Sequence, residues 1–139
     1  MATILSMPPG ERDAADDVRL DAKKKHALRC DDRHIHALRR ELRLAGLSLR
    51  DTASKTQCQM LVRILTYLGN RGLNTLEAVG LGFYRVATRV QELEAAGYTV
   101  ATAREAVIGS EGLLHAGVVR YSLDARSVPM QLSLDLGDA

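Results

Sequence analysis

The chain has 139 residues, of which 46% are hydrophobic, 26% charged and 4% aromatic, and its formal net charge at pH 7 is +2. This length fits one domain with appended segments, and the composition excludes a collagen-like, wholly disordered or membrane-embedded chain. The two cysteines lie far apart, and the chain has neither a basic leader nor a run of ~20 apolar residues. We therefore expect a soluble protein of the cytoplasm.

The charge is distributed unevenly along the chain. Residues 11–17 carry four acidic residues and one basic residue, whereas residues 19–50 carry ten basic and four acidic residues. Residues 51–139 have eight basic and nine acidic residues. Attraction for nucleic acid is therefore expected mainly in the N-terminal third. Residues 1–17, rich in acidic residues, Pro and Gly, have too few apolar side chains to repay ordering, which predicts a mobile tail.

Residues 18–50 are expected to form a basic helical segment. No Gly or Pro interrupts the chain between about residues 17 and 45. Asp31 or Asp32 is a candidate start of a separate helix, and Gly46 is a candidate end. Apolar residues at helical spacing predict one narrow stripe, which must pack on the rest of the chain or, alternatively, on a second subunit through residues 28–45. The stripe consists of Leu28, Ile35, Leu38, Leu42 and Ala45.

Three further helices are predicted between about residues 55 and 97. The first, in KTQCQMLVRILTYLGNRG, ends at the glycines and turns Met60 or Leu61, Ile64, Leu65 and Leu68 inward. The second, in NTLEAVGLG, is short and begins with Asn74 or Thr75 as its N-cap and Glu77 as the partner in a capping box. The third is FYRVATRVQELEAAG, with one apolar face made of Phe83, Val86, Ala87, Val90 and Leu93.

After Gly97 the period of the hydrophobic pattern changes from about 3.6 to 2. One β-rich arm runs from Tyr98 to Ile108, a glycine-bearing stretch follows, and a second arm runs from Val118 to Leu123. This pattern predicts a β-hairpin. The order from residue 55 onward is helix, short helix, helix, hairpin.

Residues 57–123 resemble the small winged helix-turn-helix domains of phage, prophage and plasmid proteins. The resemblance is carried by NTLEA, by FYRVATRVQEL after an apolar-Gly turn, by AAGY leading into a strand, and by RYSL at the close. It implies a mainly α fold with a β-hairpin wing (α+β), in a domain spanning residues 55–123. It also implies a non-enzymatic DNA-binding regulator that acts as a dimer in a bacterial cell or a phage-infected host.

In such a fold the third helix reads the major groove of double-stranded DNA through side chains near its N-terminus. Tyr84, Arg85, Thr88 and Arg89 occupy the face left when the apolar face turns inward. The alternative is an ordinary solvated helix surface. Because residues 51–139 carry no basic excess, residues 19–50 would have to help hold phosphates. Further candidate DNA contacts are Lys55, Arg63, Arg104 and Arg120.

His26, Cys30 and His34 share one face of the predicted helical segment, a spacing that invites zinc. Structural zinc sites, however, have four ligands in recognisable pairs, and no such pairs occur here. We therefore expect no metal and no cofactor. No phosphate-binding loop, nucleophile elbow or paired carboxylates stand out, so we also expect no enzyme.

Residues 124–139 are expected to be a flexible tail. Within it QLSLDL, residues 131–136, resembles the peptide by which many bacterial replication and repair proteins bind the ring-shaped sliding clamp. In an extended segment Leu132, Leu134 and Leu136 would enter apolar pockets while Gln131 uses its amide for directional hydrogen bonds. The alternative is a strand or a tail that folds back over the hairpin.

Two compatible functions follow from these patterns. One is a sequence-specific regulator of a mobile element, and the other is a factor docked on the clamp. A third hypothesis is a non-enzymatic inhibitor or adaptor that acts on host replication machinery without sequence-specific DNA binding, which the acidic excess of residues 51–139 would suit.

Overall fold

A computed structural model describes residues 26–124 of the chain. The expected order of helix, short helix, helix and hairpin is confirmed. The tail expected over residues 1–17 and the peptide at 131–136 lie outside the described residues. The elements in chain order are β1 (Leu28–Arg29), α3 (Asp32–Leu44), α4 (Ser54–Leu68), the 3-10 turn η1 (Gly69–Arg71), β2 (Leu73–Asn74), α5 (Thr75–Leu81), α6 (Val86–Ala95), β3 (Val100–Ile108) and β4 (Leu114–Leu123).

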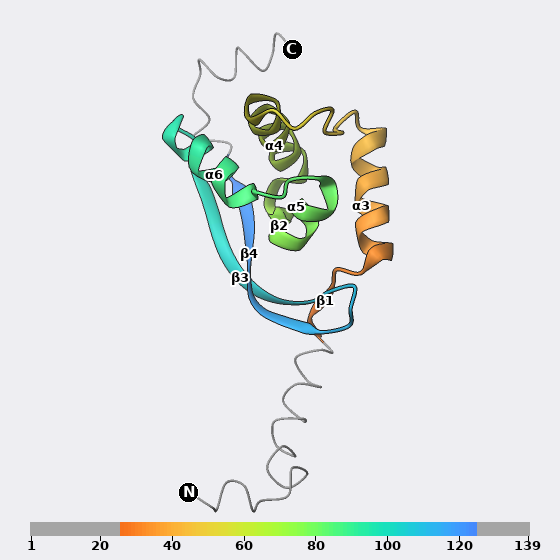
Figure 1. The fold of residues 1–139 in the computed structure, drawn as a ribbon. Helices are drawn as coiled ribbons and strands as arrows, with labels where there is room; N and C mark the ends of the chain where they lie inside the picture. Colours follow the sequence, from red (N-terminus) through yellow and green to blue (C-terminus); the bar gives the residue numbers. More distant parts are fainter. Residues whose placement is uncertain (1–25, 125–139) are drawn as a thin grey trace, which may run out of the picture.

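The helices lie on one side of a long, curved hairpin (Figure 1). Helix α5 lies between α3 and α6 and contacts both (Figure 1). The sheet has the order β1-β3-β4-β2, in which β1 is parallel to β3 and the other pairs are antiparallel. The far end of the hairpin reaches the start of α3, where the Ser110 hydroxyl donates to Asp32 over 2.9 Å. No helix among residues 26–124 has the length and apolar character needed to cross a membrane.

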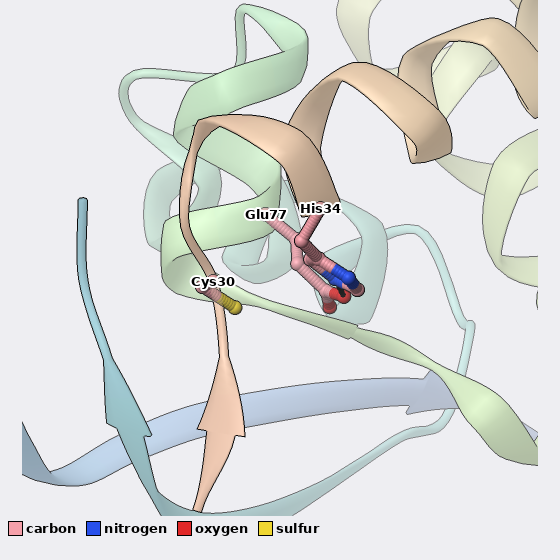
Figure 2. Close-up of side chains that lie close together, drawn as sticks. All are labelled: Cys30, His34 and Glu77. Atoms are coloured by element: carbon pink, nitrogen blue, oxygen red, sulfur yellow. Dashed lines mark hydrogen bonds and ion pairs between the residues drawn. The ribbon is translucent and has the colours of Figure 1, made fainter.

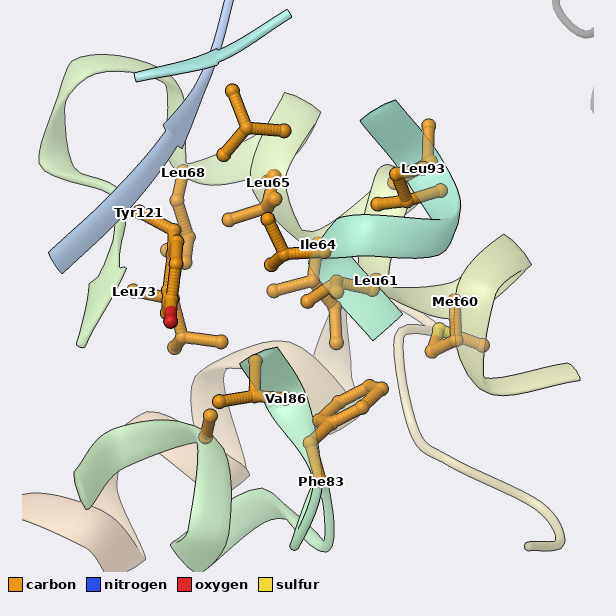
Figure 3. Close-up of a cluster of buried hydrophobic side chains, with 14 of the residues drawn as sticks. Met60, Leu61, Ile64, Leu65, Leu68, Leu73, Phe83, Val86, Leu93 and Tyr121 are labelled. Atoms are coloured by element: carbon orange, nitrogen blue, oxygen red, sulfur yellow. The ribbon is translucent and has the colours of Figure 1, made fainter. Parts of the chain in front are cut away.

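Helix α4 supplies the centre of the hydrophobic core, as its periodicity predicts. Met60, Leu61, Ile64, Leu65 and Leu68 are all buried, packed against α6 and β4 (Figure 3). Each such side chain contributes about 1.5 to 3 kcal/mol when it is fully removed from water. The other buried positions that close this core include Leu73, Phe83, Val86, Val90, Leu93 and Tyr121.

The predicted helix starts are confirmed by their caps. The Asp31 side chain accepts a hydrogen bond from the His34 backbone N–H at the start of α3. At the start of α5, Asn74 and Glu77 form the reciprocal capping box, with both hydrogen bonds at 2.8 Å. These contacts satisfy backbone donors that have no partner inside a helix.

Part of the N-terminal segment that was expected to be helical is a strand, whereas the separate helix expected from Asp31 or Asp32 is present. Leu28 and Arg29 form a strand because their backbone pairs with Val107 and Ile108 of β3, a partner about 80 residues away. The stripe on α3 packs within one chain, since Leu38 and Leu42 are buried in the common core. Those two residues are not available to a second subunit. A dimer through residues 28–45 would have to use side chains that remain exposed.

Candidate nucleic-acid interface

The segment between α5 and α6 is a tight turn held at one end by a buried ring. Gly82 closes α5 in the left-handed conformation, with φ of +107°, which a residue with a Cβ rarely adopts. Phe83 follows, and its backbone N–H donates to the Ala78 carbonyl over 2.8 Å while its side chain is fully buried. The next residues, Tyr84 and Arg85, are thereby turned outward.

Helix α6 begins at Val86, three residues later than the pattern predicts, so Tyr84 and Arg85 belong to the turn. Tyr84 is 78% exposed and Arg85 is also exposed. Arg85 is the N-cap of α6, and no side chain caps the backbone N–H groups of its first turn. Thr88, half-buried, lies within this first turn. An aromatic ring, a cation and free N–H donors are therefore gathered at one helix end.

Three of the other predicted contacts are exposed cations on other elements. Lys55 and Arg63 are both exposed on α4. Arg104 is exposed on β3, where its Nη1 donates to the Gly117 carbonyl of β4 over 3.0 Å. Both guanidinium and ammonium groups at such positions suit phosphate contact.

Arg89 does not lie on the solvent-facing side of α6, and that expectation was wrong. Its side chain is only 9% exposed, and its Nη2 lies 3.1 Å from Glu92 Oε1. The Arg89 Nε is buried without a hydrogen-bond partner. Residue 89 lies three positions after Val86 and four before Leu93, so it falls on the buried stripe of α6. The helical spacing of residue 89 predicts a buried position, whereas the positive charge of arginine favours an exposed one.

Arg120 is also committed to contacts inside the protein. Its Nε and Nη2 donate to the two carboxylate oxygens of Glu105 over 2.7 and 2.8 Å. Its Nη1 lies 3.1 Å from Glu77 Oε1 and donates to the Arg71 carbonyl over 2.8 Å. The Arg120 guanidinium holds the pKa of Glu105 below its ordinary value. A guanidinium with these partners is not free to contact a phosphate.

The basic helix α3 packs against the helix-turn-helix unit, which consists of α5, the turn at Gly82 and α6. Arg39 Nη2 donates to the Gly80 carbonyl over 2.6 Å, two residues before the Gly82 turn. The Ile35 side chain packs against Gly80, where a Cβ would lie only 2.5 Å from its Cγ2. Arg33, Arg40 and Arg43 are exposed on this helix. The sequence placed these cations in a basic segment, but only the fold shows that α3 contacts α5.

A second group of polar side chains lies where α3 meets the start of α5. Cys30, His34 and Glu77 place their sulfur, ring nitrogen and carboxylate oxygen within 4.8 Å of one another (Figure 2). The sequence had grouped Cys30 and His34 with His26 on one helix, but Cys30 precedes α3 and the third member is Glu77. The sequence indicates Glu77 only as a capping residue, because nothing local in it points to His34, 43 positions away.

A family model described as a winged helix-turn-helix domain matches residues 56–126, just over half of the chain. The matched region contains α4 from residue 56 onward, α5, α6 and the hairpin, and it leaves out β1 and α3. Among curated proteins nothing matches the chain. Nothing among solved structures matches it either.

Proposed function

Because the chain belongs to the winged helix-turn-helix domain family, we propose that it is a regulator that binds double-stranded DNA in a sequence-specific manner. The observation that carries this proposal is the outward-turned pair Tyr84 and Arg85 at the uncapped start of α6. In the proposed complex Arg85 reaches base edges or a phosphate, and Thr88 contacts the neighbouring backbone. The first N–H groups of α6 favour a phosphate because they carry partial positive charge.

Exposed cations on other elements would supply sequence-independent affinity. Lys55 on α4 and Arg104 on the hairpin each add a phosphate contact in this proposal, and the exposed arginines of α3 extend the basic surface past α5. Each phosphate that is neutralised contributes about −0.9 to the slope of log affinity against log salt. Alanine in place of Lys55 or Arg104 should reduce that slope by about one without changing the preferred sequence.

The proposal is tested by selecting bound duplexes from a random double-stranded DNA library with the full-length chain. A preferred duplex is expected, and Arg85→Ala should reduce its advantage over a scrambled duplex by about 1 to 3 kcal/mol. Arg63→Ala is the matched control, since it removes the same charge from an exposed position on α4, where a phosphate contact would carry no sequence information. It should leave that advantage intact. Failure to select any duplex, with Arg85→Ala binding like the unchanged chain, would exclude the proposal.

We also propose that the regulated gene or replication origin belongs to a mobile element, and that the protein works in the cytoplasm of its bacterial host. This part rests on the resemblance of residues 57–123 to phage, prophage and plasmid domains. A reporter gene placed behind the selected duplex should change its expression when the chain is produced in bacteria. Arg85→Ala should abolish that change, and an unaltered reporter would contradict the regulatory role.

A second candidate activity, compatible with the first, is docking on the sliding clamp through QLSLDL. The supporting observation is the match of Gln131, Leu132, Leu134 and Leu136 to the clamp-binding pattern. Purified clamp should bind the full chain, and Gln131→Ala with Leu134→Ala should abolish that binding, whereas Ser133→Ala should not. Clamp binding without any DNA preference would favour the inhibitor or adaptor hypothesis. If the chain with Gln131→Ala and Leu134→Ala binds the clamp as well as the unchanged chain does, the docking proposal is excluded.

A further inference from the structure

The junction between α3 and α5 contains a compact polar cluster that DNA binding does not use. Cys30 lies just before α3 and is only 3% exposed, and Glu77, in the first turn of α5, is also buried. His34, in the first turn of α3, is half-buried, and its Nε2 lies 2.7 Å from Glu77 Oε2. Figure 2 shows the His34 ring beside the Glu77 carboxylate, with the Cys30 sulfur turned toward both.

We infer that Cys30, His34 and Glu77 bind a transition-metal ion of the zinc class. Thiolate, imidazole and carboxylate are the donors that zinc takes from proteins, at about 2.0 to 2.3 Å, so tetrahedral ligand atoms lie about 3.3 to 3.6 Å apart. The three donor atoms lie within 4.8 Å of one another in the ion-free protein. Binding an ion therefore needs movements of roughly 1 Å, in which His34 Nε2 and Glu77 Oε2, now 2.7 Å apart, exchange their hydrogen bond for bonds to the ion.

The surroundings of each donor are those of an outer ligand shell. Glu77 Oε1 is occupied by the Asn74 backbone N–H and by Arg120, which leaves Oε2 to face the cluster. The Asn74 side-chain amide lies 3.4 Å from Cys30 Sγ and donates to it. Such hydrogen bonds orient metal ligands and stabilise a thiolate. The same contacts also make the carboxylate rigid, because both of its oxygens are positioned before an ion arrives.

The charges in this cluster balance once an ion is bound. The negative charges of a thiolate and a carboxylate balance a divalent cation. The positive charge of the nearby Arg120 is balanced by the Glu105 carboxylate, to which it donates two hydrogen bonds. Because a metal ion binds a cysteine as its thiolate, metal binding releases the thiol proton of Cys30.

A cavity of about 200 Å³ lies against two of the three proposed ligands. It is lined by His34 and Glu77 together with Leu38, Glu41 and Arg71. A water molecule entering here would complete the tetrahedron as the fourth ligand, because the described residues offer three. The ion would join α3, which lies outside the matched family region, to α5 inside it. The bound ion would therefore hold the basic helix α3 in place against the helix-turn-helix unit.

The direct test uses the full chain without a polyhistidine tag, stripped with a chelator and titrated with cobalt(II) under reducing conditions. A thiolate-to-cobalt charge-transfer band is expected, with intense visible bands of four-coordinate cobalt that added zinc removes. Cys30→Ser should abolish the charge-transfer band, and Cys58→Ser, which removes the other cysteine, should leave it unchanged. His34→Gln should weaken cobalt binding at least about tenfold. A hydrated-cobalt spectrum from the unchanged chain would overturn the inference.

A second measurement leaves all three proposed ligands in place. In the Cys58→Ser chain, Cys30 is the only thiol, and its alkylation rate is compared with and without zinc. Zinc should slow alkylation at least about tenfold and raise the melting temperature, since an ion that binds only the folded state stabilises it. The His34→Gln version of this chain should show neither effect. Equal alkylation rates with and without zinc would contradict the metal site.

Discussion

Arg120 on β4 donates two parallel hydrogen bonds, of 2.7 and 2.8 Å, to the carboxylate of Glu105 on β3. The two residues are diagonal neighbours across the hairpin, since Arg120 is paired with Ala103 and Glu105 with Val118. The same guanidinium lies 3.1 Å from Glu77 at the start of α5. One side chain therefore joins the hairpin to the helix-turn-helix unit, which makes it a structural residue and not a surface cation.

Replacing Arg120 with alanine should lower the free energy of unfolding by about 3 kcal/mol. Removal of the guanidinium leaves the Glu105 and Glu77 carboxylates close together without a compensating charge. Urea denaturation of the full chain measures this loss. Arg104→Ala is the matched control, because Arg104 is an exposed arginine on the same hairpin, and its loss should cost less than about 0.5 kcal/mol. Similar losses for the two variants would contradict the structural role of Arg120.

Arg85 and Arg89 should behave oppositely when each is changed to methionine. Arg85→Met removes an exposed charge at the start of α6 and should weaken binding to the selected duplex about tenfold with unchanged stability. Arg89→Met removes a buried guanidinium whose Nε has no hydrogen-bond partner, and it leaves Glu92, whose side chain is 42% exposed, to water, so stability should be unchanged or higher. Fluorescence anisotropy with labelled duplex and urea denaturation separate the two effects. A tenfold loss of DNA affinity in Arg89→Met would show that Arg89 leaves its buried position to bind DNA.

Gly80→Ala should destabilise the protein by about 1 to 3 kcal/mol, although alanine is the better helix former. The added Cβ would lie 2.5 Å from Ile35 Cγ2 and 2.9 Å from its Cδ1, so α3 would have to move away from α5. Ile35→Ala in the same chain should restore part of the loss, because it removes the colliding atoms. Urea denaturation of both single variants and the double variant measures this coupling. Additive effects would mean that α3 does not press on α5 at this point.

Cys58 should react slowly with alkylating agents in the folded protein. Burial, together with a hydrogen bond from its sulfur to Glu92 Oε2 at 3.0 Å, raises the pKa of the Cys58 thiol from 9.0 to about 12. In a Cys30→Ser chain, where Cys58 is the only thiol, the alkylation rate should rise with a midpoint far above pH 9. Glu92→Gln should lower that midpoint, because it removes the acceptor charge.

The same raised pKa predicts how stability changes with alkali. The folded state holds the Cys58 proton more tightly than the unfolded state, so its contribution to stability is complete below the unfolded pKa near 9. That contribution is lost as the pH rises from about 9 to about 12. Urea midpoints across this range should fall less steeply for Cys58→Ala than for the unchanged chain. Parallel curves for the two proteins would rule out Cys58 as a source of the alkaline loss.

Local features of the chain were predictable from the sequence because they depend on neighbouring residues. The caps at Asp31 and Asn74, the turn at Gly82 and the hairpin after Gly97 need only short-range hydrogen bonds and backbone preferences. The inward face of α4 follows from helical periodicity in the same way. Because these signals also occur in the expected order, the sequence by itself determined the fold class.

The tertiary structure alone decided what distant segments do to one another. Leu28 and Arg29 are a strand only because β3 offers a free edge, since two residues cannot hold an extended conformation by themselves. Arg89 is buried because α6 packs on α4, and packing overrides the preference of an arginine for water. Cys30, His34 and Glu77 meet because α3 lies against α5, and such side-chain contacts leave no mark on local spacing.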